Sequence, residues 1–123
     1  MKHSAILIVD DEQRYADMLA RRLQLRGLNC TVCYDGQSAI DLNARESFAM
    51  IILDLRLPDL YGTEVLARIK QCRPAAQVVI LTGHGTEKDR ERCMQGGAYA
   101  FLNKPVGIDQ LVNIMSRINE KTS

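Results

Sequence analysis

The feature that most constrains the fold of this chain is a short apolar run followed directly by polar residues, a pattern that occurs four times. The runs and the polar residues after them are Ala5–Val9 with Asp10–Glu12, Met50–Leu53 with Asp54, Val78–Leu81 with Thr82, and Tyr99–Leu102 with Asn103–Pro105. Apolar runs of this length, rich in β-branched side chains, are typical of buried strands. Because open α/β sheets place their ligand sites at the carboxyl ends of strands, we expect these polar side chains on one rim of a sheet.

The segments between these runs have helical patterns. The first, from Glu12 to about Arg26, carries an apolar stripe at helical spacing and is followed by Gly27, a residue typical of helix C-termini. Further helices are expected at about 37–45, 63–72, 87–95 and 108–119, and further strands at about 29–34 and 98–102. Alternating strands and helices predict one α/β domain over residues 1–123, a doubly wound parallel sheet with helices on both faces.

Length, charge and hydropathy narrow the class of protein. A chain of 123 residues is long enough to bury a core without disulfides or a structural metal. The formal net charge of +1 gives no bias toward nucleic acid. No stretch approaches the ~20 apolar residues of a membrane span, and no signal peptide precedes the first strand. We therefore expect a cytoplasmic protein without membrane contact.

The four cysteines include a C-x-x-C sequence, Cys30 to Cys33, which in other contexts marks a redox site. Redox motifs of this kind lie at a helix start, whereas here both residues fall in a predicted strand. Residues three apart on a strand face opposite sides of the sheet. We therefore expect reduced thiols that pack separately, and no His–Cys cluster suggests zinc.

The residues expected at the rim have the composition of a phosphoryl-transfer site. Asp10, Asp11 and Asp54 would bring three carboxylates together, and two like charges at ~4 Å repel by about 4 kcal/mol at an effective dielectric constant of ~20. Their oxygen ligands favour Mg²⁺ (or Mn²⁺) as the neutralising cation. Asp54 would then be the acceptor, with Thr82 and Lys104 binding phosphate oxygens. The alternative, solvated acids at strand ends, leaves Thr82 and Lys104 without an explanation.

Two loops near this rim have distinctive backbone chemistry. Lys104–Pro105 is a candidate cis peptide bond, because a tight turn there would aim the lysine ammonium inward. Gly83 and Gly85 in the preceding loop either let the backbone approach a phosphate closely or serve only as turn residues. The six consecutive charged residues at 87–92 predict a largely solvated helix after that loop.

The chain resembles the receiver domain of two-component response regulators over about residues 5–119. The matching segments, in chain order, are ILIVDDE, MIILDLRLPDLYG, VVILTGHG and GGAYAFLNKP. The TGHG and GAYAFLNKP sequences look most like receivers that precede AAA-type transcription activators. The resemblance implies a flavodoxin-like (βα)5 fold with strand order 2-1-3-4-5, and a phosphoacceptor in a signalling relay rather than an enzyme.

The resemblance also implies individual roles. Asp54 would take a phosphoryl group from a sensor histidine kinase, a histidine phosphotransfer protein or a small donor such as acetyl phosphate. The ligands of Mg²⁺ would be Asp10, Asp11, Asp54 and the backbone carbonyl of Arg56. Thr82 and Phe101 would form a switch pair that acts on the face of the fourth helix, fifth strand and fifth helix. That face would contact an effector domain or protein, or a second copy of the chain.

Four further residues are candidates for finer roles. Arg56 and His84 lie two residues after Asp54 and Thr82, where their side chains would overhang a phosphate and modulate its hydrolysis. His84 is equally well explained as a solvent-facing loop residue. Tyr15 and Met18 flank the apolar stripe of the first helix. They form either a docking patch for the phosphodonor protein or simply a wide core stripe.

Two other functions remain as alternatives. A Mg²⁺-dependent phosphohydrolase of the haloacid dehalogenase type also uses an aspartate nucleophile, but it needs an acid two residues later, where this chain has Arg56. A flavodoxin-like binding module needs a phosphate-cradling loop after the first strand, where Asp10–Glu12 would repel phosphate.

Overall fold

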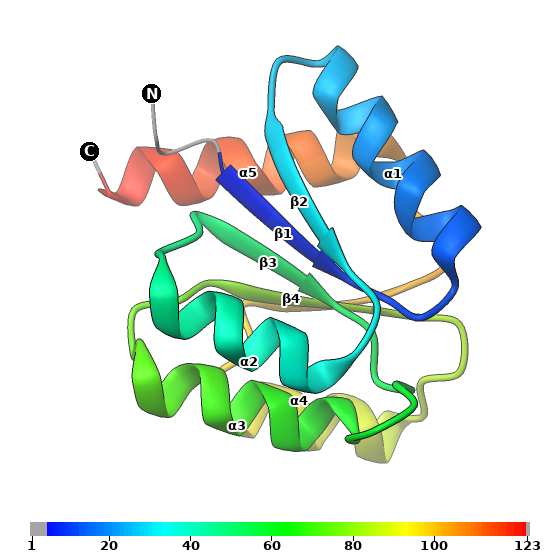
Figure 1. Cartoon of the computed structure of the whole chain (residues 1–123), viewed down its shortest axis with the longest axis vertical. Coiled ribbons are helices and arrows are strands. Elements are labelled where there is room, and N and C mark those ends of the chain that lie inside the picture. Colours follow the sequence, from blue (N-terminus) through cyan, green and yellow to red (C-terminus); the bar gives the residue numbers. More distant parts are fainter. Residues whose placement is uncertain (1–4, 123) are drawn as a thin grey trace.

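The computed structural model describes residues 5–122, in which five strands and five helices alternate along the chain (Figure 1). The strands are β1 (Ala5–Val9), β2 (Asn29–Cys33), β3 (Met50–Leu53), β4 (Val78–Thr82) and β5 (Ala100–Asn103). The helices are α1 (Gln13–Leu25), α2 (Gly36–Arg45), α3 (Gly62–Cys72), α4 (Glu87–Gln95) and α5 (Ile108–Thr122).

All four strand pairings are parallel, and the sheet order is β2-β1-β3-β4-β5. The predicted fold class and strand order are therefore confirmed. Strand β3 is central, and its carboxyl end lies beside that of β1, since Val9 pairs with Leu53. The arrowheads of β1 and β3 point toward the same side in Figure 1. The residues that follow these two strands consequently meet at one edge of the sheet.

The sheet separates two apolar cores. Helices α2, α3 and α4 cover one face, and α1 and α5 cover the other (Figure 1). Within β3, Ile51 packs into the first core and Ile52 into the second. Because both faces are covered, every residue of β3 and β4 is buried, and these strands appear in the sequence as unbroken apolar runs. The strand that Asp54 follows is thus enclosed on both faces.

Strand β5 begins at Ala100, whereas the sequence predicted a start near residue 98. The hydrogen bonds at the end of α4 explain this difference. Gly97 has a φ of 98°, and the backbone N–H groups of Gly97 and Ala98 donate to the carbonyls of Met94 and Cys93. This Schellman arrangement keeps residue 98 within the helix terminus. Cys93 is the only buried residue of α4, as the charge run predicted. Within residues 5–122, no helix is long and apolar enough to cross a membrane.

The cysteines are free thiols, as predicted. Cys33 is buried in the core under α2 and α3, whereas Cys30 packs toward the core under α1 and α5. Burial raises the pKa of Cys30 to about 11 and that of Cys33 to about 12. Both thiols are therefore protonated at neutral pH and poorly suited to redox chemistry.

Candidate functional site

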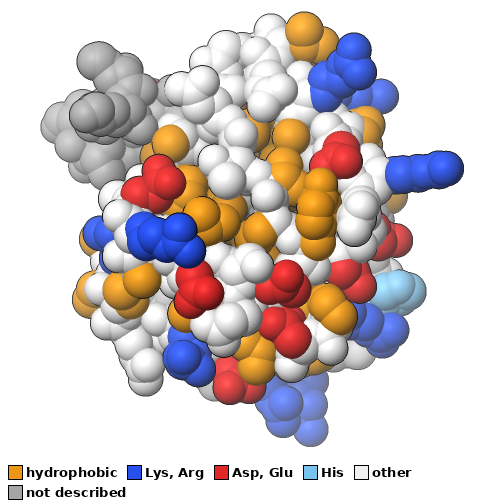
Figure 2. All heavy atoms as spheres, in the orientation of Figure 1, with side chains coloured by type: hydrophobic (Ala, Val, Ile, Leu, Met, Phe, Trp, Pro, Cys, Tyr) orange, Lys and Arg blue, Asp and Glu red, His pale blue; other side chains and the backbone are white. Residues whose placement is uncertain are grey.

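The site is organised around the ammonium group of Lys104, in the loop between β5 and α5. Its Nζ atom lies 2.8 Å from Asp10 Oδ2, 2.6 Å from Glu12 Oε1 and 3.2 Å from Asp54 Oδ2. One carboxylate oxygen of each acid lies within 4.8 Å of the other two. Figure 2 shows acidic side chains gathered near the histidine on this side of the molecule. The predicted meeting of Asp10, Asp54 and Lys104 is present in the structure.

Asp10 and Asp54 are fixed by the strands they follow and by the next turn of backbone. The N–H groups of Asp10 and Asp54 donate to Cys33 and Val9, which continues the parallel pairing past the strand ends. Asp10 Oδ1 accepts from the N–H of Glu12 at 3.0 Å, and Asp54 Oδ1 accepts from the N–H of Leu55 at 2.7 Å. In each acid, the other oxygen, Oδ2, is therefore the one that faces Lys104.

The electrostatics of the cluster follow from its partial burial. Burial raises the pKa of Asp10, and the hydrogen bonds from Lys104 and Glu12 offset this only in part. Burial alone would lower the pKa of Lys104, but its bonds to Asp10 and Glu12 and the charge of Asp54 raise it. The hydrogen bond from Lys104 lowers the pKa of Glu12. Lys104 is thus a permanent cation, and three carboxylates share its single charge.

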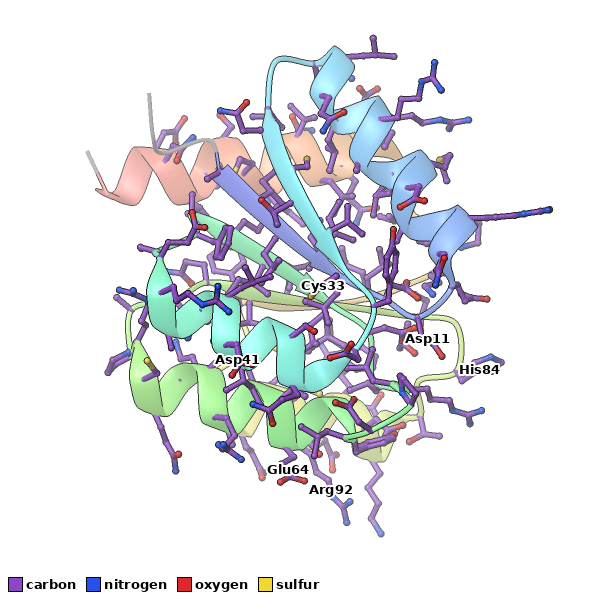
Figure 3. All side chains as sticks on the ribbon, in the orientation of Figure 1. Asp11, Cys33, Asp41, Glu64, His84 and Arg92 are labelled. Atoms are coloured by element: carbon purple, nitrogen blue, oxygen red, sulfur yellow. The ribbon has the colours of Figure 1, made fainter. Side chains whose placement is uncertain are left out.

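Asp11 lies outside this cluster, although the sequence predicted it as a metal ligand with Asp10. Its side chain is exposed, at the same end of the sheet as His84 (Figure 3). Glu12 takes the third position instead, and the analysis of the sequence did not single it out. Two features of the sequence could have indicated Glu12. It directly follows the Asp10–Asp11 pair, and its side chain is one methylene longer than that of aspartate. Coordination of a metal by Asp11 stays a prediction.

Thr82 and Lys104 are neighbours through the backbone as well as by position. The N–H of Lys104 donates to the carbonyl of Thr82 at 2.9 Å, and the Lys104–Pro105 peptide bond is cis, as predicted. The Thr82 side chain is fully buried, and its Oγ1 accepts from the N–H of His84 at 3.3 Å. The hydroxyl at the end of β4 and the ammonium of the residue after β5 therefore lie at the same end of the sheet.

In the loop after Thr82, packing against Phe101 explains one of the two glycines. A Cβ atom on Gly85 would lie 2.5 Å from Phe101 Cζ and 2.8 Å from Thr82 Cγ2. At Gly83, the nearest heavy atom would be Lys104 Cδ, at 3.8 Å. Gly85 thus makes room for the half-buried ring of Phe101 beside Thr82. Packing therefore requires glycine at position 85, and the two predicted switch residues lie in one packed group.

Replacing Gly85 with alanine is therefore expected to destabilise the protein by about 1–3 kcal/mol, because Phe101 or Thr82 must move to admit the methyl group. Gly83→Ala is the matched control, since its added methyl meets only ordinary van der Waals contact. Urea unfolding of both variants measures the difference. Equal free energies of unfolding for the two variants would contradict this account of the packing.

The loop after Asp54 is tied to α2. Asp59 accepts hydrogen bonds from the N–H groups of Gly36 at 2.8 Å and Gln37 at 2.9 Å. Desolvation would raise the pKa of Asp59, but these backbone bonds outweigh it and lower the pKa. Arg56, a predicted modulating residue, is exposed in the same loop and pairs with Tyr61 in a short antiparallel bridge. Metal binding by the Arg56 carbonyl and modulation by its side chain stay predictions.

Tyr15 and Met18 are half-buried on α1, as expected for residues at the edge of its apolar stripe. The Lys104 ammonium also lies over one face of the Tyr15 ring, with Nζ 4.7 Å from the ring centroid. Burial raises the pKa of Tyr15, and its hydroxyl interacts with the backbone of Val106. Tyr15 therefore supports Lys104 directly, a contact that the spacing of apolar residues did not indicate. Docking of a partner at these residues stays a prediction.

Residues 6–116 match the sequence profile of the family described as response regulator receiver domain. The chain belongs to this family. The predicted resemblance is confirmed, and the matched span includes Asp10, Asp54, Thr82 and Lys104. Membership of this family of two-component signalling explains why acids, a hydroxyl and an ammonium lie at one edge of the sheet.

The receiver is 31% identical over 117 residues to the DNA-binding transcriptional regulator NtrC of Escherichia coli strain K12, covering 95% of this chain and 25% of that protein. Similarity to receivers of AAA-type activators is thereby confirmed. The chain spans less than half the length of the curated relatives it matches first.

Two solved structures show the same fold. A CheY-like receiver domain protein from Methanospirillum hungatei JF-1 is 28% identical, with a TM-score of 0.90 and coverage of 96% of this chain and 95% of that one. A response regulator from Burkholderia pseudomallei with a phosphorylated aspartic acid, calcium ion and citrate is 25% identical, with a TM-score of 0.84 and coverage of 97% and 72%.

Proposed function

We propose that this receiver accepts a phosphoryl group on Asp54 from a sensor histidine kinase or a histidine phosphotransfer protein. The observation that carries the proposal is the position of Asp54, whose Oδ2 lies beside Lys104 at the end of the central strand. The phosphorylated aspartic acid of the structurally similar Burkholderia pseudomallei regulator supports it.

The transfer chemistry follows from how Asp54 is held. Its Oδ1 is occupied by the N–H of Leu55, which leaves Oδ2 to attack the phosphorus. A bond forms between Oδ2 and phosphorus while the bond from phosphorus to the donor nitrogen or oxygen breaks, and the donor keeps that electron pair. Lys104, and Thr82 after a movement of its hydroxyl, bind the oxygens of the transferred group.

The acidic cluster fits Mg²⁺ (or Mn²⁺), because it offers carboxylate oxygens and holds more negative charge than Lys104 neutralises. Asp10, Asp54 and the backbone carbonyl of Arg56 would hold the ion, with Asp11 turning inward. When bound, the ion screens the charge that develops on the phosphoryl oxygens. Asp10 and Asp54 have their Oδ1 atoms fixed by the backbone, so these two carboxylates need little reorganisation.

The phosphorylated state would be read through Thr82 and Phe101. A movement of the Thr82 hydroxyl toward the phosphate vacates space beside the Phe101 ring, whose packing on Gly85 links it to the start of α4. The response would reach α4, β5 and α5, and through them an effector or a second copy of the chain. Arg56 and His84, both exposed near the site, would modulate the lifetime of the phosphate.

Incubation with acetyl phosphate and Mg²⁺ tests this function against its alternatives. The expected product is a stable mass increase of one phosphoryl group, lost on treatment with hydroxylamine, which cleaves acyl phosphates. Continuous release of phosphate from many phosphate esters would instead indicate a hydrolase. Copurification of a yellow flavin would indicate a binding module on the same fold.

Met18→Ala is expected to slow transfer from a cognate phosphohistidine protein about tenfold while leaving labelling by acetyl phosphate nearly unchanged. Met18 is half-buried on the helix that begins beside the site, and a protein donor must cross this edge, whereas a small donor needs no docking surface. Leu25→Ala is the control, since Leu25 is 80% exposed at the far end of α1. Equal slowing with both donors would show that Met18 matters only for packing.

A further inference from the structure

The ammonium group of Lys104 is crowded by carboxylates where a phosphoryl group would bind, with hydrogen bonds to Glu12 and Asp54 and an ion pair with Asp10. An ammonium has three N–H bonds, and the three carboxylates of Asp10, Glu12 and Asp54 surround Nζ at 2.6–3.2 Å. The Lys104 side chain is only 11% exposed, so a phosphoryl oxygen has no open route to Nζ from the solvent. A phosphoryl oxygen can reach Lys104 only by displacing one of these three partners.

We propose that Glu12 is an internal competitor of the phosphoryl group, and that its ion pair with Lys104 must open before Asp54 can be phosphorylated. This inference rests on the proposed function of Asp54 and adds a regulatory residue to the same site. It assigns to Glu12 a role opposite to that of Asp10 and Asp54, which assemble the site, because Glu12 holds back the reaction.

The three acids differ in how easily they release Lys104. The side chains of Asp10 and Asp54 are only 5% and 7% exposed, and a backbone N–H holds the second oxygen of each. The Glu12 side chain is 64% exposed, and Lys104 is its one hydrogen-bond partner among the contacts resolved at this site. Withdrawing Glu12 into water costs the least, so Glu12 is the partner that leaves.

The remaining contacts keep Lys104 in place once Glu12 has left. The face of the Tyr15 ring lies beneath Nζ, with its centroid at 4.7 Å, and this contact does not involve Glu12. The departure also removes a negative charge from the path of an anionic donor. The exchange replaces one Lys104 hydrogen bond with another and transfers no proton.

Glu12→Gln tests the proposal, because glutamine keeps the size of the side chain and removes its charge. At saturating Mg²⁺, labelling of Asp54 by acetyl phosphate is expected to accelerate about two- to fivefold, the factor that an exposed ion pair contributes. Affinity for beryllofluoride, measured by ¹⁹F NMR, is expected to rise by a similar factor. Glu12→Asp keeps the charge but shortens the reach, and it should show the same direction of change.

Glu64→Gln is the matched control for net charge, since Glu64 is exposed on α3 away from the site (Figure 3). An equal acceleration in Glu64→Gln, or unchanged or slower labelling and binding in Glu12→Gln, would overturn the proposal. If neither wild type nor variant is labelled, but the variant binds beryllofluoride more tightly, the proposed function fails while the competition at Lys104 stands. Equal beryllofluoride affinities in that case would reject both.

Discussion

Asp54→Asn is expected to reduce phosphoryl incorporation from acetyl phosphate to background. The substitution keeps the size of the side chain, but an amide oxygen is a far weaker nucleophile than a carboxylate oxygen. Asp54 is also the one acid of the cluster that follows the central strand, and its Oδ2 lies 3.2 Å from Lys104 Nζ. Intact-protein mass spectrometry after incubation with Mg²⁺ and acetyl phosphate measures the effect.

Asp41→Asn provides the control for this experiment. Asp41 is an exposed acid of α2 whose resolved side-chain partner is Gln37, and its loss should leave labelling unchanged (Figure 3). Persistent full labelling of Asp54→Asn would mean that another residue is the acceptor. Peptide mapping of the labelled variant would then identify it.

Lys104→Met is expected to slow labelling by about 10²–10³-fold, because it removes the cation that stabilises charge on the transferred group. The same change leaves Asp10 and Asp54 facing each other without a cation, which destabilises the metal-free protein. Addition of Mg²⁺ should therefore raise the thermal midpoint of the variant more than that of the wild type. Labelling rates and melting curves at several Mg²⁺ concentrations measure both effects.

The control is Lys88→Met, which removes a lysine on the exposed face of α4. It should change neither the labelling rate nor the response of the melting temperature to Mg²⁺. A Lys104→Met protein that is labelled at the wild-type rate would show that Lys104 does not bind the phosphoryl group.

The sequence alone was sufficient to predict the elements and the central pair of the site. Asp54 and Lys104 each follow an apolar run, and parallel pairing brings the ends of such runs to one edge. This pattern did not show which residue is the third acid, because Asp11 and Glu12 are neighbours that both follow the first strand. Only the bond from the N–H of Glu12 to Asp10 shows how the chain turns there. Side-chain length then lets Glu12 reach Lys104.

Contacts between distant segments account for the other differences. The need for glycine at position 85 depends on a ring sixteen residues later in the chain, and spacing does not reveal it. The support of Lys104 by Tyr15 likewise joins α1 to the loop before α5. In β5, the late start reflects hydrogen bonds at the end of α4 that a pair of glycines permits but does not specify.

The hydrogen bonds of Asp59 join the loop after Asp54 to the start of α2. The N–H groups of Gly36 and Gln37 are satisfied by Asp59, and a Cβ on Gly36 would meet Val65 at 2.8 Å, so α2, α3 and the loop after Asp54 form one interlocked block. Helix α4 buries a single residue, and the hydroxyl of Tyr61 at the start of α3 donates a hydrogen bond to Asp89 Oδ1 of α4 at 3.2 Å. Because α4 has fewer buried contacts to lose than α2 and α3, we expect a displacement of the loop after Asp54 to shift α4 more readily than this block.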